Sequence, residues 1–176
     1  MLMMHLNSRQ AGVTLLEVMI TIVVTAIGLL GMVALQTRAY AIESESYERS
    51  QAAILLADME NRIRSNGANA AAYVASDIGV GAAEACDAAG TTAEKDLCAW
   101  GNLLRGAAET HNGSSVGAMT LARGCITNPS ANEYVISVSW QGSLKTKAPG
   151  SSCGKDEYSD ETLRRSLSTV VQVATL

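Results

Sequence analysis

The chain has 176 residues, a formal net charge of −4 and a pI of about 5.2. This length allows one modest domain plus an anchor, and the acidic balance excludes a global positive field that would attract nucleic acid. Phenylalanine is absent and proline occurs only twice, so we expect a core built mainly from leucine, isoleucine, valine and methionine, with other features adding stability.

The first predicted element is an apolar run from Val13 to Leu35, in which Glu17 is the only charged residue. As a helix, this run would be about 35 Å long, which is enough to cross a hydrocarbon core of about 30 Å. Arg9 and the amino terminus precede the run, whereas Glu43 and further acidic residues follow Arg38. Because positive charge marks the cytoplasmic side, we expect the chain after the run to lie outside the cytoplasm.

Three interpretations of this run compete. A secretory signal peptide would be cleaved after Ala39-Tyr40-Ala41 and would release a periplasmic binding domain that begins at Ile42, but its apolar core usually has about 7–15 residues. A plain single-span anchor does not explain a carboxylate that costs about 2.5–3.5 kcal/mol in a bilayer. In the third interpretation, cleavage between Gly12 and Val13 creates an amino group one helical turn before Glu17. The carboxylate then neutralises an amine of its own or a neighbouring chain and sets the register of packed helices.

The segment GVTLLEVMITIVVTAIGLLGMVALQ, residues 12–36, resembles the N-terminal signature of type IV pilins. That signature combines a short polar leader, a glycine, an acid at fixed spacing and a long apolar span. The resemblance implies that prepilin peptidase cuts after Gly12 and N-methylates Val13, and that Glu17 is needed for assembly. Val13 stands where the family usually has phenylalanine or methionine.

The helix is predicted to continue beyond the apolar run. Residues 36–66 contain no proline or glycine, and Asn66-Gly67 is typical of a helix end. One apolar face follows helical spacing and should pack under a head; it consists of Ala52, Leu55, Leu56, Met59 and Ile63. The predicted organisation is a leader (1–12), a transmembrane and assembly segment (13–35), an amphipathic helical segment (36–66) and a periplasmic globular head (67–176).

The head is predicted to contain one short helix followed by strands. Thr91 and Glu94 fit a capping box, which predicts a helix over 92–105. Alternating apolar residues predict strands within 133–142 and 163–173, a third strand is expected at 118–127, and a turn at 113–117. Residues 66–90 give no clear pattern. The predicted class is therefore α+β, with a long N-terminal helix packed on a small antiparallel sheet.

Four cysteines lie in the part expected outside the cytoplasm: Cys86, Cys98, Cys125 and Cys153. An even number in that location favours disulfides. Of the three pairings that four cysteines allow, Cys86–Cys98 with Cys125–Cys153 is favoured, because each bond closes a local loop and stabilises by about 3 kcal/mol. Free thiols are the alternative. A metal site is not expected, because there is no C-x-x-C pair and His111 is the only histidine outside the leader.

Two other motifs are weaker. Residues 113–117 match the G-x-S-x-G pattern of a nucleophile elbow, but they follow a polar stretch, whereas an elbow follows a buried strand. We therefore expect no catalytic residues, no enzymatic activity and no cofactor. Three lysines, Lys145, Lys147 and Lys155, form a small basic loop that neighbouring acids offset, and we interpret it as solvated surface.

Three further stretches, GLLGMVALQTRAYA, DLCAWGNLL and VISVSWQG, resemble PilV-type minor pilins, the type IV pilus modification group. This resemblance implies a low-copy subunit that joins other minor pilins and the major pilin in a tip or priming complex. It would use the inner-membrane assembly platform and support adhesion or motility, with a tip adhesin as a further partner. It would span the inner membrane once and then reach the pilus and cell surface. A type II secretion pseudopilin is the alternative, because it shares the N-terminal signature.

Overall fold

The computed structural model describes residues 12–88, 90–107, 110–112, 114–115 and 119–174. Most of the predicted leader lies outside these residues. The chain forms two compact units, Met1–Ile42 and Glu43–Leu176, and helix α1 (Leu15–Ser65) contributes to both. The second unit is called the head below, and it includes the last part of α1.

The N-terminal unit presents apolar side chains to its surroundings. Helix α1 contains a segment that is long and apolar enough to cross a membrane, and its large apolar residues from Leu15 to Leu35 are exposed. The hydroxyls of Thr21 and Thr25 donate to the carbonyls of Val18 and Thr21, at 2.8 and 2.7 Å. These hydroxyls therefore need no solvent partner, as an apolar environment requires.

In the head, α1 buries the predicted apolar face. The buried residues are Glu48, Ala52, Leu55, Leu56, Met59 and Ile63, which confirms the predicted stripe and adds one carboxylate. The helix ends at Ser65, beside the predicted stop, and a 3-10 helix, η1 (Gly67–Tyr73), follows it. The hydroxyl of Tyr73 donates to Asp96 at 2.5 Å, and Arg62 pairs with the same carboxylate at 2.8 Å. This network fixes the end of α1 to the rest of the head.

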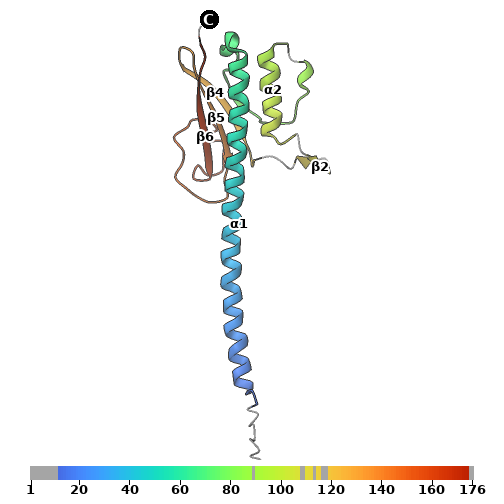
Figure 1. Cartoon of the computed structure of the whole chain (residues 1–176), viewed down its shortest axis with the longest axis vertical. Helices are drawn as coiled ribbons and strands as arrows, with labels where there is room; N and C mark the ends of the chain where they lie inside the picture. The colour runs from blue at the N-terminus through green and yellow to red at the C-terminus, as the bar shows by residue number, and fades with distance from the viewer. Residues whose placement is uncertain (1–11, 89, 108–109, 113, 116–118, 175–176) are drawn as a thin grey trace, which may run out of the picture. The chain divides into compact units, whose positions relative to one another are not determined.

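The sheet has four strands in the order β1-β4-β5-β6, and all neighbouring strands are antiparallel. Their bounds are β1 Ala75–Ile78, β4 Arg123–Ser130, β5 Glu133–Gln141 and β6 Arg164–Gln172. Helix α2 (Thr92–Leu104) contacts β1 and β4 directly, and Figure 1 shows it beside the head segment of α1. The α+β class, with a long helix and a small antiparallel sheet, is therefore confirmed.

Helix α2 begins with the predicted capping box. The Thr91 hydroxyl accepts from the Glu94 N–H at 3.2 Å, and the Glu94 carboxylate accepts from the Thr91 N–H at 2.8 Å. Trp100 of α2 is fully buried, and its Nε1–H donates to the Leu55 carbonyl at 2.9 Å. The ring lies over Gly124 of β4, where a side chain would meet it. Glycine at this position therefore allows α2 to contact the sheet.

Two element predictions need correction. The strand expected at 118–127 begins at Arg123 and runs to Ser130, because Leu121 takes a left-handed φ of 51° that makes a turn before the strand. Residue 118 lies outside the described residues. The turn expected at 113–117 is also wrong at Ser114–Ser115, which form strand β3 and pair with β2 (Thr110–His111).

The segment between α1 and α2, which gave no sequence pattern, contains regular elements. It contributes η1, β1 and a second 3-10 helix, η2 (Cys86–Ala88). Strand β1 has only four residues and a register shift against β4. Such a short and irregular strand gives too few alternating positions to show a period in the sequence.

Strand β5 is buried on both faces. Tyr134, Ile136, Val138 and Trp140 form the predicted face toward the core, and Ser137 and Ser139 on the other face are buried as well. The segment 142–163 covers this second face, since the Tyr158 hydroxyl lies 3.2 Å from the Ser139 hydroxyl. The sheet is therefore the middle layer of the head.

Candidate functional site

The N-terminal end of α1 holds the residues that the sequence singles out for processing. Gly12, Val13 and Thr14 precede the helix, and Val13 is 70% exposed. The Glu17 N–H donates to Thr14 Oγ1 at 3.3 Å, and the Val18 N–H donates to the Thr14 carbonyl at 3.2 Å. Thr14 thus caps the helix, and the bond between Gly12 and Val13 lies outside the first helical turn.

Glu17 lies in the first turn of α1 and is exposed. Within the described part of the chain, its carboxylate forms no ion pair. A carboxylate in the first turn is favoured by the helix dipole, but it needs a cation before it can enter an apolar environment. The arrangement therefore suits neutralisation by an amino group, either the new terminus of Val13 or that of another chain.

Two disulfides hold the head, Cys86–Cys98 and Cys125–Cys153. This is the pairing that the local loops favour, and none of the four cysteines is free. The first bond ties η2 to α2, and the second ties β4 to the segment that covers the outer face of the sheet. On loop-entropy grounds, each stabilises by about 3 kcal/mol.

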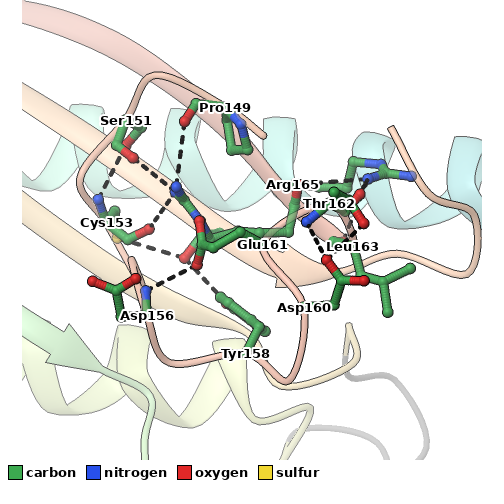
Figure 2. A network of polar contacts seen from close by, with 12 residues as sticks. Pro149, Ser151, Cys153, Asp156, Tyr158, Asp160, Glu161, Thr162, Leu163 and Arg165 are labelled. Atoms are coloured by element: carbon green, nitrogen blue, oxygen red, sulfur yellow. Dashed lines mark hydrogen bonds and ion pairs between the residues drawn. The ribbon is translucent and has the colours of Figure 1, made fainter. Parts of the chain in front are cut away.

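A buried arginine, Arg164, organises the segment that follows β5; Figure 2 labels its partners Pro149, Ser151, Cys153 and Glu161. Arg164 is 2% exposed. Its guanidinium donates to the carbonyls of Ser151 at 2.7 Å, Cys153 at 3.1 Å and Pro149 at 3.3 Å. It also pairs with Glu161 at 2.7 Å. One side chain therefore positions the disulfide-bonded stretch on the sheet.

A second ion pair joins the first and last elements of the head. Glu45 of α1 pairs with Arg165 of β6 at 2.8 Å, and the Leu144 N–H donates to the same carboxylate at 3.0 Å. Burial opposes ionisation of Glu45, but the hydrogen bonds from Arg165 and Leu144 and the charge of Arg165 outweigh it. The pKa of Glu45 is therefore below its ordinary value of 4.5.

This ion pair predicts a pH dependence of stability. A lowered folded-state pKa stabilises the head above the ordinary pKa, and this contribution is lost as pH falls through the folded-state pKa. We expect Glu45→Gln to cost about 1 kcal/mol at pH 7 and to cost nothing once pH has fallen below the folded-state pKa. Thermal unfolding of both proteins between pH 7 and pH 3, roughly the range that spans carboxyl titration, measures this difference.

Glu43→Gln is the matched control, because Glu43 is exposed on the same helix and forms no ion pair with a described residue. It should follow the unsubstituted protein at every pH. A cost of Glu45→Gln that stays constant as pH falls would contradict the assigned role of the ion pair.

Glu48 is a further buried carboxylate that the sequence does not reveal. It is 8% exposed, and its Oε1 accepts from the Thr120 hydroxyl at 3.2 Å and the Thr120 N–H at 3.4 Å. In the sequence, this residue belongs to a run of polar residues, and only the position of Thr120, 72 residues later, brings it a partner.

The structure does not assemble a nucleophile elbow from the described part of residues 113–117. Ser115 lies in β3, which pairs with β2 through a short hairpin around Asn112, whereas an elbow joins a buried strand to a helix. No group of three or more metal-ligating residues gathers among the described residues. The absence of enzymatic activity stays a prediction.

The small basic loop is partly neutralised. Lys145 pairs with Asp160 at 2.8 Å and is 74% exposed. Hydrogen bonds from Lys145 and Thr162, together with the charge of Lys145, hold the pKa of Asp160 far below its ordinary value. The loop therefore presents less positive charge than its sequence indicates.

The fold and the N-terminal site together define a class of protein: a head of α+β fold carried on a helix with a membrane-compatible segment and a potential cleavage point before it. Residues 7–33 match the family model of the prokaryotic N-terminal methylation motif. This match supports a type IV pilin-like or pseudopilin-like protein that prepilin peptidase processes and that assembles with other pilins. No curated protein and no solved structure matched the chain.

Proposed function

We propose that the chain is a minor pilin of a type IV pilus, of the PilV type, that acts in a tip or priming complex. Prepilin peptidase cuts after Gly12 and methylates Val13, and the mature chain spans the inner membrane once with its head in the periplasm. It then joins other minor pilins, the major pilin and the assembly platform, and supports adhesion or motility. The observation that carries this proposal is the methylation motif on an exposed helix end, with Glu17 as the single unpaired charge of its apolar segment in the described residues.

Two further observations support processing at Gly12. The small-residue site Ala39-Tyr40-Ala41 lies within helix α1, whereas Gly12 precedes the helix; proteases prefer exposed, irregular segments. The disulfides suit a head that lies in an oxidising compartment. A mature chain that begins at Val13 agrees with the proposal, and one that begins at Ile42 indicates a released binding domain.

The assembly role of Glu17 is tested by Glu17→Ala in cells that make the pilus. We expect normal cleavage and membrane insertion, but at least about tenfold less of this chain in sheared pili, the factor that corresponds to about 1.4 kcal/mol. The loss follows because an amino group in the filament would lack its partner.

Glu43→Ala is the control, since it removes an exposed acid from the same helix outside the apolar segment. Equal incorporation of Glu17→Ala and Glu43→Ala would overturn the register role. A type II secretion pseudopilin is the second candidate, because the motif is common to both; secretion defects without loss of pili in a deletion strain would favour it.

A further inference from the structure

The two edge strands of the head sheet, β1 and β6, differ in how well they are protected against pairing with a strand of another protein. Edge strands expose unpaired main-chain groups, and proteins usually protect them by short length, bulges or charges. Strand β1 uses all three: it has four residues, its register shifts against β4, and Asp77 carries a charge at a left-handed φ of 55°. Arg123 also pairs with Asp77 at 3.0 Å.

Strand β6 has none of these protections over its second half. It runs for nine residues in unbroken register with β5, from Arg164 opposite Gln141 to Gln172 opposite Glu133. The stretch Ser166–Gln172 contains no charge, proline or glycine. Such an edge is an open template for another strand.

The register shows which main-chain groups are free. The Leu163 carbonyl accepts from Gly142, and the Val173 N–H donates to Asn132, so the odd-numbered residues of β6 face β5. The even-numbered residues Ser168, Val170 and Gln172 therefore point their N–H and C=O groups away from the sheet. Among the described residues, no backbone hydrogen bond outside the β5–β6 ladder involves these groups.

We propose that the β6 edge from Ser168 to Gln172 pairs with an extended, uncharged strand of a different protein subunit. The free main-chain groups would hydrogen-bond to the added strand. Val170, which is 53% exposed and lies opposite Val135 on the outer face, would contact an apolar side chain of that strand. Because this edge of β6 is uncharged, the added strand should be uncharged as well. A charged side chain placed against the edge would lose its solvation without gaining a counter-charge.

The direction of β6 favours a different subunit over a second copy paired in the antiparallel sense. Near the start of β6, Arg165 contacts Glu45, and just after its end, Val173 lies beside Gly67. Strand β6 therefore runs in the same direction as the head segment of α1. An antiparallel pair of two β6 strands would reverse one α1 relative to the other, whereas chains that enter one filament by the same N-terminal segment share a direction. This step rests on the proposed function.

Val170→Lys in the full chain tests the edge, because an edge lysine opposes strand addition. The matched control is Val74→Lys, which replaces a valine that is 48% exposed beside β1. With equal thermal stability of both variants, we expect at least about tenfold less Val170→Lys in sheared pili and unchanged Val74→Lys. If Val170→Lys is incorporated normally while Glu17→Ala is missing from the pili, the proposed strand pairing at the β6 edge is wrong and the proposed function stands. Normal incorporation of Glu17→Ala overturns the register role of Glu17, and absence of the unsubstituted chain from sheared pili overturns the proposed function itself.

Two further measurements test the proposed strand pairing without using Val170→Lys, so they are valid even if that variant fails to fold. In the unsubstituted full chain, amide exchange at Val170 should be at least about tenfold slower in pili than in detergent; equal exchange overturns the proposal. A photo-crosslinking residue at Gln172 should give an adduct with a different pilus subunit, and one at Ser76 of β1 should not. An adduct of two copies of this chain, or no adduct at Gln172, overturns the proposal.

Discussion

Gly124→Ala is expected to destabilise the head by about 3 kcal/mol, which lowers its Tm by roughly 10 °C. A Cβ at this position would lie 2.1 Å from Cζ3 and 2.4 Å from Cη2 of Trp100, and 2.9 Å from Cδ1 of Leu104. The indole cannot simply move away, because it is fully buried and its Nε1–H is bonded to the Leu55 carbonyl. Thermal unfolding of the full chain in detergent, followed by circular dichroism, measures the effect.

Gly150→Ala is the matched control, since an added Cβ there has no atom within 4 Å. Its cost should stay within about 0.5 kcal/mol. Trp100→Leu destabilises on its own by removing a buried ring, but in the double variant it should remove most of the penalty of Gly124→Ala, because the clashing atoms are gone. If Gly124→Ala unfolds at the same temperature as Gly150→Ala, the described contact between α2 and β4 is wrong.

Arg164→Met is expected to cost about 3 kcal/mol and to release the segment between β5 and β6. The substitution fills much of the space of the buried side chain but removes the donors to three carbonyls, at Pro149, Ser151 and Cys153, and each unsatisfied carbonyl carries a desolvation cost. Arg164→Lys should be intermediate, because an ammonium lacks the planar fork that reaches several acceptors at once. Thermal unfolding and limited proteolysis within 142–163 measure the two consequences.

Arg64→Met serves as the control, because Arg64 is a half-exposed arginine that pairs only with Glu60, one turn earlier on α1, among the described residues. It should change stability by less than about 0.5 kcal/mol. Intact resistance of residues 142–163 to protease in Arg164→Met would contradict the role assigned to Arg164 in holding this segment.

The helical part of the fold could be predicted because its signals are local. An uninterrupted helix-compatible run ending at Asn66-Gly67 predicted α1 to within two residues at its start and one at its end. The capping box of Thr91 and Glu94 likewise marked the start of α2. The two disulfides close short loops, so proximity along the chain was sufficient to favour their pairing.

The buried polar residues and the short strand β1 were not predicted, because they depend on residues far away along the chain. Arg164 belongs to a basic pair in the sequence, and only the folded segment before β6 supplies the carbonyls that allow its burial. Glu48 and Glu45 lie among exposed polar residues and gain partners 72 and 120 residues later. Strand β1 was not predicted because its register shift and the left-handed Asp77 break the alternation.

The candidate processing site could be found from the sequence because its residues are close together along the chain. In the proposed function, Gly12, Val13 and Glu17 act through their spacing along one segment, and residues 7–33 match the family model of the methylation motif. The open edge of β6 could not be found in this way. It depends on which strand lies outermost in the sheet, and strand order is set by pairings that the alternation of single strands does not encode.

The ion pair between Glu45 and Arg165 connects the earliest and latest parts of the head. A growing polypeptide therefore cannot complete this domain until Arg164–Gln172 have left the ribosome or translocon, and until then β5 lacks its neighbour. A product that stops before Arg164 would display that bare strand to proteases and chaperones. Only molecules that contain β6 can therefore complete the described sheet and reach a stable head.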